Sequence, residues 1–292
     1  MTMKNRKKVL AVLLAAAVTG TGLGAGVFVP DKGHAVEAAE SEFVIEDGVL
    51  TRYNGLGGMV VIPDGVTKIG GGVFGYYCDN TSDIAGVIIP NSVKEIGREA
   101  FAGCNGLTSL TIPDSVENIG EEAFSRCTML TEMTIPGSVK SVGHGILGYC
   151  YNLKKVTLQN GVPEISDSMF AMSGSLTDVV VPDSVTSIGS CAFQDCVNLT
   201  KFEMPDSVTQ ISWSAFADCK GLEEITIPKN VKKIEHDVFK DCNGLKNVQI
   251  PNGVEYIENS AFIRCNSLKE ITIPGSVKTI EGYVFSGCTG LT

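Results

Sequence analysis

The sequence predicts an α/β repeat solenoid: a right-handed leucine-rich-repeat superhelix with a parallel concave β-sheet, short convex extended and helical turns, and an N-terminal β-hairpin cap. Three observations predict it. The pattern Ile-Pro-x-x-Val-x-x-Ile-x-x-x-Ala-Phe-x-x-Cys-x-x-Leu-x-x-Ile-x recurs from residue 62 onward. Its period is 23 residues, after a first copy of 27, and leucine-rich repeats have periods of about 20 to 29 residues. A single copy buries too little apolar surface to fold alone, so neighbouring copies must share one core.

Each part of the repeat predicts one element of the coil, as residues 182–204 illustrate. Phe202 and Met204 alternate with polar residues, which is typical of a strand with one buried face, and we expect such segments to form the parallel sheet. Val-x-x-Ile predicts a short extended piece on the outer side. The Ala-Phe-x-x-Cys-x-x-Leu segment has three- and four-residue spacings and predicts a single helical turn.

Residues 1–38 are predicted to be a secretory signal peptide. Four basic residues within residues 1–8 precede an apolar run over residues 9–18, which is the usual order in such signals. Cleavage after Ala35 or Ala38 would suit the preference for small residues. An uncleaved membrane anchor that extends to Val29 is the alternative.

The mature chain is predicted to contain a cap and a solenoid. Residues 39–59 form the N-terminal cap hairpin, which turns at Asp47-Gly48 and covers the first strand at residues 59–62. Residues 60–292 form the solenoid of about ten copies of 23 residues, with the last copy truncated. Irregular copies over residues 142–173 are expected to bend the stack. We expect the chain to be a fragment, so a wall-sorting signal, a stalk or a catalytic domain could follow Thr292.

The repeats carry a specific family resemblance. The segments IPDSVTSIGSCAFQDCVNLT, IPKNVKKIEHDVFKDCNGLK and IPNGVEYIENSAFIRCNSLK resemble the BspA-like class of bacterial leucine-rich repeats, and the likeness extends over about residues 60–292. The resemblance implies a secreted or surface-attached solenoid. It also implies a role in adhesion, since some members of the family resemble adhesins for host matrix proteins, whereas many members have no known ligand.

The charge of the chain limits its partners. Removal of residues 1–38 takes away five positive and two negative charges and changes the net charge from −10 to −13. This balance argues against nucleic acid and anionic membrane as partners. We expect no integral membrane span after signal cleavage and a secreted or cell-surface location. The oligomeric state stays open.

No pattern in the sequence indicates an enzyme, a cofactor or a metal site. Nine of the ten cysteines occupy one column of the repeat, which predicts a reduced ladder of buried thiols, with disulfides as the alternative. Cys191 lies outside that column and is the one candidate for a reactive thiol. His144 and His236 are four copies apart, about 19 Å at 4.8 Å per coil, so they cannot share a metal or a proton relay. We therefore assign no catalytic, cofactor-binding or metal-binding residues.

The function is predicted to be non-enzymatic binding or adhesion to an extracellular protein or a cell-surface or matrix polymer. Two alternatives stay open: a spacer or recognition half of a larger secreted enzyme or wall protein with domains beyond residue 292, and a structural wall component without a ligand. Candidate contacts are polar residues that point outward on the strands and exposed aromatic residues, which often anchor interfaces. They are Tyr76, Tyr77, Lys201, Glu203, Trp213, Glu224, Thr226, Asn247, Gln249, Tyr256, Glu270 and Thr272.

Overall fold

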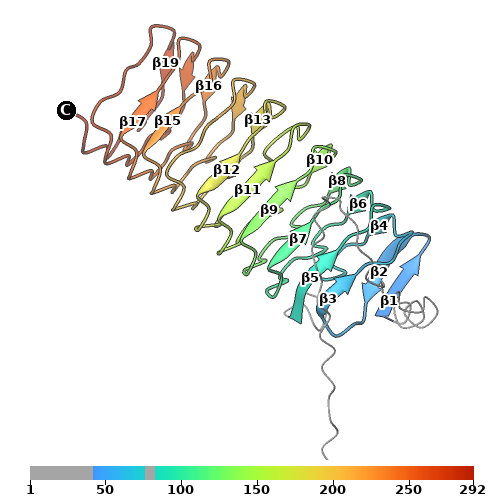
Figure 1. The fold of residues 1–292 in the computed structure, drawn as a ribbon. Helices are drawn as coiled ribbons and strands as arrows, with labels where there is room; N and C mark the ends of the chain where they lie inside the picture. The colour runs from blue at the N-terminus through green and yellow to red at the C-terminus, as the bar shows by residue number, and fades with distance from the viewer. Residues whose placement is uncertain (1–41, 76–82) are drawn as a thin grey trace, which may run out of the picture.

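The chain folds into an elongated stack of coils, each made by one repeat (Figure 1). The structure, a computed structural model, describes residues 42–75 and 83–292. The predicted signal peptide, Tyr76, Tyr77 and Cys78 lie outside the described residues. Within these two ranges, no helix has the length and the apolar character needed to cross a membrane. The predicted repeat solenoid with parallel strands is confirmed, whereas the α/β class is not, because helix is almost absent from the described residues.

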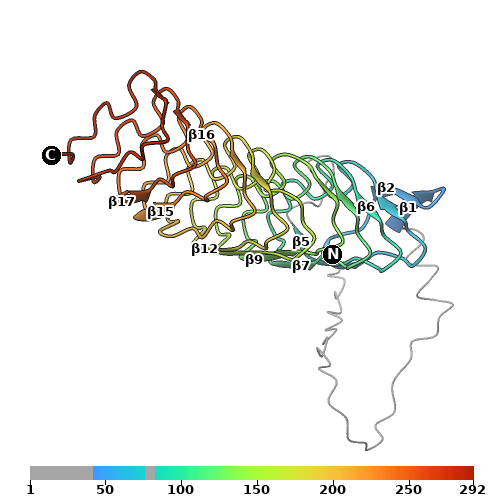
Figure 2. The same ribbon diagram turned by 90° about the horizontal axis from the view of Figure 1, so that it is seen from above.

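The predicted sheet strands lie along one side of the stack, which we call the long-strand side. Partners are one repeat apart, so that Lys155 pairs in parallel with Glu132 on one side and with Asp178 on the other. Figure 2 shows β5, β7, β9 and β12 along one edge of the stack. The strands are β3 (Gly58–Val61), β5 (Ile84–Ile88), β7 (Ser109–Thr111), β9 (Glu132–Ile135), β11 (Lys155–Leu158), β12 (Asp178–Val180), β15 (Glu224–Thr226) and β17 (Asn247–Gln249).

The Val-x-x-Ile segments form a second set of parallel strands, each two residues long, which we call the short-strand side. Ile69 pairs with Ile96, and Ile96 pairs with Ile119. The predicted extended piece is therefore hydrogen bonded from coil to coil. The strands are β4 (Lys68–Ile69), β6 (Glu95–Ile96), β8 (Asn118–Ile119), β10 (Ser141–Val142), β13 (Ser187–Ile188), β14 (Gln210–Ile211), β16 (Lys233–Ile234), β18 (Tyr256–Ile257) and β19 (Thr279–Ile280).

The Ala-Phe segment forms tight turns, and the predicted helical turn is not confirmed. One residue with a left-handed backbone conformation precedes the Ala-Phe pair, and a second lies two residues after the Phe. A left-handed residue cannot continue a right-handed helix, and its conformation costs about 1–2 kcal/mol. The backbone instead hydrogen bonds to the next coil, as in Phe101 N–H to Ala123 O at 2.8 Å. The two left-handed columns are Glu99, Glu122, Gly145, Ser168, Cys191, Ser214, Asp237, Ser260 and Tyr283, and Gly103, Arg126, Tyr149, Met172, Asp195, Asp218, Asp241, Arg264 and Gly287.

Aromatic rings and thiols form two columns in the core. The rings of Phe74 and Phe101 stack at a centroid distance of 5.0 Å, and the column continues along the stack except at Leu147, which replaces a phenylalanine. Each described thiol of the cysteine column donates to the phenylalanine carbonyl of the preceding coil, as in Cys219 Sγ to Phe193 O at 3.1 Å. The free thiols are those of Cys127, Cys150, Cys191, Cys196, Cys219, Cys242, Cys265 and Cys288.

The N-terminal hairpin caps a different strand from the one predicted. β1 (Phe43–Glu46) and β2 (Val49–Tyr53) are antiparallel and turn at Asp47-Gly48. The expectation that the hairpin lies on residues 59–62 is wrong, because β2 pairs in parallel with β4 on the short-strand side. The hairpin covers the end of the core from that side, where the Tyr53 ring packs 5.1 Å from the ring of Phe74.

The irregular copies interrupt the short-strand side and leave the long-strand side intact. β9, β11 and β12 pair continuously across this region, whereas the six-stranded sheet ends at β10 and only an isolated bridge joins Ile165 to Ile188. In the regular coils, the residue directly after the valine of Val-x-x-Ile donates its backbone N–H to the coil before it, as in Lys140 N–H to Glu117 O at 2.8 Å. Pro163 occupies this position in the irregular copy. Pro163 has no N–H and cannot donate to Lys140 in the same way.

Candidate functional site

The outward residues of the long strands form one polar surface, which we call the strand face. Residues alternate between the core and this face, so each coil contributes two side chains to it. Three hollows lie on the strand face, and the largest of them has a volume of about 900 Å³ and extends over β7, β9 and β11. Asn91, Asp114 and Gln159 line it from the segments beside these strands. The strands themselves contribute six polar side chains to its lining, which are Ser109, Thr111, Glu132, Thr134, Lys155 and Thr157. Sequence reasoning missed this hollow as a site, although the alternation that exposes these six residues was readable in the repeat.

A second hollow brings together six of the predicted contact residues. Its volume is about 340 Å³, and it lies over β15, β17 and the segment before them. The Lys201 ammonium lies 3.1 Å from the Glu224 carboxylate, but both side chains are largely exposed, so this pair contributes little to stability. The six predicted residues are Lys201, Glu203, Glu224, Thr226, Asn247 and Gln249.

A third hollow lies between the other two along the strand face. Its volume is about 340 Å³, and it lies over Asp178 and Val180 while sharing Lys201 and Glu203 with the second hollow. Glu270 and Thr272 are exposed on the last coil and line none of the three hollows. The strand face is therefore hollowed from about residue 87 to residue 249.

Trp213 and Tyr256 lie away from the strand face, on the short-strand side. Tyr256 belongs to β18, and Trp213 follows β14 by two residues. Tyr256 is 43% exposed, and Trp213 is 44% exposed. The Trp213 indole stacks on the His236 imidazole, with ring centroids 5.8 Å apart and planes 4° from parallel. The predicted contacts thus divide between two sides of the stack.

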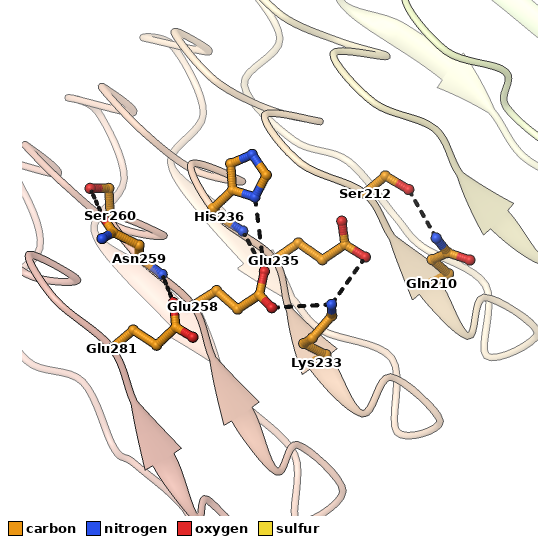
Figure 3. Close-up of polar contacts among 9 residues, drawn as sticks. All are labelled: Gln210, Ser212, Lys233, Glu235, His236, Glu258, Asn259, Ser260 and Glu281. Carbon is orange, nitrogen blue, oxygen red and sulfur yellow. Dashed lines mark hydrogen bonds and ion pairs between the residues drawn. The ribbon is translucent and has the colours of Figure 1, made fainter.

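Glu258 holds the residues beside this aromatic pair. Figure 3 shows its carboxylate between Lys233 and His236. One oxygen lies 3.1 Å from Lys233 Nζ, and the other accepts the His236 backbone N–H at 3.2 Å and lies 3.9 Å from His236 Nδ1. The hydrogen bond that Lys233 donates to Glu258 raises the pKa of Lys233. Together these contacts fix the backbone that carries the imidazole.

The cysteine and histidine side chains do not assemble a reaction centre among the described residues. Cys150 is fully buried and donates to Phe124 O at 3.3 Å, and burial raises its pKa to about 12. A protonated, buried thiol is inert as a nucleophile. Cys191 is half-buried, and burial followed by the nearby charge of Asp167 raises its pKa, so it lacks the environment of a reactive cysteine.

No metal site is formed within residues 42–75 and 83–292. In these ranges, no group of three or more His, Cys, Asp or Glu side chains could hold an ion. His144 Nε2 pairs with Glu121 at 3.2 Å, far along the stack from His236 and Glu258. The two histidines therefore belong to separate surface pairs.

Comparisons with known proteins identify the repeats. The family described as "BspA type Leucine rich repeat region (6 copies)" matches residues 57–177 and 163–292. A leucine rich cell surface protein from Faecalibacterium prausnitzii is similar in structure, with 28% identity, a TM-score of 0.57 and 85% of each chain covered. No curated protein matches this chain.

Two further solved structures share the fold. A leucine-rich repeat protein from Bacteroides ovatus has 24% identity and a TM-score of 0.52, with 84% of this chain and 81% of that chain covered. The pneumococcal vaccine antigen PcpA has 22% identity and a TM-score of 0.56, with 85% and 77% covered. At these identities the likeness concerns the fold alone.

Proposed function

Because the chain belongs to the BspA-type leucine-rich-repeat family, we propose that it is a secreted or cell-surface protein that binds another protein or a surface polymer on its strand face. The observation that carries the proposal is the run of three hollows on that one face. The similar protein from Faecalibacterium prausnitzii is described as a cell surface protein, which supports the location. The proposed role is adhesion without catalysis.

The shape and chemistry of the hollows favour an extended ligand. Small-molecule sites are usually concave, mostly apolar and able to enclose their ligand. The largest hollow is lined by polar and apolar residues in similar measure, and its hydroxyl and charged groups come from three successive coils, which repeat at about 4.8 Å. A polypeptide or polymer that crosses several coils would meet the same kind of group at each step.

The proposal is tested by solid-phase binding of the protein to matrix proteins, mucins and bacterial cell-wall polymers, at low and at physiological salt. Saturable binding to one of these classes is expected at both salt concentrations. Thr134→Arg places a bulky charge in the largest hollow and should weaken that binding at least tenfold. Thr226→Arg makes the corresponding change in the second hollow and separates the two parts of the face.

Thr209→Arg is the matched control, because Thr209 is exposed on the short-strand side. Its binding should equal that of the unchanged protein. Circular dichroism checks that all three variants are folded. Equal weakening by all three substitutions would place the ligand elsewhere, and uniform absence of binding to every probe would contradict the proposed function.

A further inference from the structure

One outward column on the short-strand side contains an aromatic ring with one uncovered face and a carboxylate that has no cationic partner among the described residues. The column lies two residues after the isoleucine of Val-x-x-Ile, and adjacent coils are about 4.8 Å apart. Gly71 and Gly282 occupy this position near the two ends of the stack, and between them it is occupied by Arg98, Glu121, His144, Asp167, Ser190, Trp213, His236 and Asn259.

One face of the Trp213 indole is covered and the other is open. The covered face meets the parallel imidazole of His236 in the next coil. The Glu258 carboxylate accepts the backbone N–H of His236 and holds this residue in place (Figure 3). The opposite face therefore points toward the coil of Ser190, whose side chain is small. Among the described residues, no ring other than His236 stacks on Trp213 and no cationic group lies over it.

Asp167 directs its carboxylate toward the same space. One of its oxygens accepts the Ser190 backbone N–H at 2.6 Å, which places the carboxylate at the level of the Ser190 coil. The part of the chain that the structure describes supplies no cationic partner for it. Glu121, in the same column, is paired by contrast with His144 at 3.2 Å and with Arg98 at 3.6 Å.

Elsewhere in the chain, a guanidinium group already lies over an aromatic ring of the adjacent coil. The Arg126 guanidinium lies 4.8 Å from the centre of the Tyr149 ring, one coil further along. Both residues belong to a column on the turn side in which arginine precedes tyrosine. In the Trp213 column, the preceding position is occupied by Ser190, so the corresponding cation is missing.

We propose that Trp213 and Asp167 form a receptor for an arginine side chain of a partner polypeptide. The guanidinium would stack on the open indole face above Ser190 and hydrogen bond to the free oxygen of Asp167. Arginine fits better than lysine, because its planar group stacks on aromatic faces and matches a carboxylate with two donors. The net charge of −10 further favours a basic partner. This receptor lies on a different side of the stack from the strand face.

The test uses the fluorescence of Trp213, the single tryptophan of the chain. The full chain is titrated with the capped tripeptide Gly-Arg-Gly, and Gly-Lys-Gly and Gly-Gln-Gly are titrated in parallel at millimolar concentrations. A saturable change is expected with the arginine peptide, a weaker one with the lysine peptide, and none with the glutamine peptide. Equal responses to the arginine and glutamine peptides would overturn the proposal.

Asp167→Asn removes the charge but keeps an oxygen that can accept the Ser190 N–H. It should weaken binding of the arginine peptide about threefold, which is typical of an exposed ion pair. Asp183→Asn is the matched control, because it removes the same charge at another exposed position, and it should leave the affinity unchanged. Equal affinities of the two variants would overturn the role of Asp167.

Ser190→Arg offers an internal guanidinium to the indole. Its resting fluorescence should resemble that of the arginine-bound protein, and its response to the peptide should disappear. Ser190→Gln is the matched control and should retain most of the response. A response to maltose and not to the arginine peptide would assign the indole face to a neutral sugar ring and overturn the proposal.

Discussion

The two halves of the short-strand side are built on the same Val-x-x-Ile segment but pair differently. From β2 to β10 the strands belong to one continuous sheet of six strands, which includes the hairpin. Later strands form a two-stranded sheet, β13 and β14, and a three-stranded sheet, β16, β18 and β19. The difference arises outside the core, because the same apolar columns are buried in both halves.

The residue after the isoleucine also changes between the halves. In the first half it is glycine, and a Cβ at Gly120 would lie 2.5 Å from the backbone nitrogen of Arg98. In the second half the position is occupied in turn by Ser166, Gly189, Ser212, Glu235, Glu258 and Glu281. The break between β14 and β16 falls where the first of the glutamates appears, but the glutamate-bearing strands β16, β18 and β19 still pair with one another.

The glutamates provide contacts that glycine cannot make. Glu258 accepts the His236 N–H, and Glu281 accepts the Asn259 N–H at 2.9 Å. These carboxylates reach the coil before their own and hold the residues of the outward column, including the imidazole that stacks on Trp213. The comparison teaches that one repeat can change the residue after its isoleucine, and with it the contacts on its surface, while its core stays the same.

The shared core predicts the largest effect, and this effect should be equal in the two halves. Phe124→Ala and Phe216→Ala each remove a fully buried ring from the phenylalanine column and should destabilise the protein by about 3–5 kcal/mol. Urea unfolding followed by circular dichroism measures both. If either substitution left the unfolding midpoint unchanged, the two halves would not share one core.

The glycine that follows the isoleucine predicts a smaller effect. Gly120→Ala forces a methyl group against the Arg98 backbone and should cost about 1–3 kcal/mol. Gly282→Ala is the control, because Gly282 lies one position later in its repeat and the nearest atom to its Cβ would be Asn259 Nδ2 at 3.6 Å. We expect its unfolding midpoint to stay the same. Equal costs for the two substitutions would remove the physical basis of the comparison.

The repeat period made the stacking and the registers predictable, because residues 23 apart had to meet in neighbouring coils. Asp47-Gly48 also located the hairpin turn, where both residues have positive φ angles of 51° and 78°. The partner strand of the hairpin was not predictable in the same way. The first coil contains two strands, β3 and β4, and the sequence does not indicate which of them the hairpin extends.

The helical turn was mispredicted because the left-handed positions seldom carry a recognisable signal. Most are non-glycine residues such as Glu122 and Tyr149, and only a few coils have glycine there, as at Gly145. The spacing of buried residues is the same in a tight turn and in one helical turn. By contrast, the stacking of Trp213 on His236 could have been predicted, because the two residues are 23 apart in one column.

The cysteine column predicts an effect near the boundary of the two halves. Ser173 occupies this column naturally, where its Oγ donates to Leu147 O at 2.8 Å and accepts the Cys150 N–H at 3.1 Å. Cys196→Ser should find an equivalent acceptor in Phe170 O, to which the thiol already donates at 3.2 Å. The expected cost is about 1 kcal/mol or less, measured by urea unfolding, with Ser173→Cys as the reciprocal change. A cost above about 3 kcal/mol would mean that the hydroxyl is left unsatisfied.

The smallest effect concerns two equivalent ion pairs, one in each half. Lys140 Nζ lies 2.6 Å from Glu117, and Lys278 Nζ lies 2.5 Å from Glu255. In each pair the hydrogen bond from the lysine lowers the pKa of the glutamate below its ordinary value of 4.5. Because the folded pKa is the lower one, each pair stabilises the protein above the unfolded pKa. That contribution is lost as the pH falls through the folded pKa.

Carbon-detected NMR titration of the two carboxyl groups tests whether these pairs depend on the half in which they lie. Lys140→Met should raise the pKa of Glu117 toward its ordinary value and leave that of Glu255 unchanged, and Lys278→Met should do the converse. Both glutamates are partly exposed to solvent, which screens them from distant charges. If one substitution moved both pKa values, the charges would be coupled along the stack, and the two halves could not be treated as separate surfaces on one core.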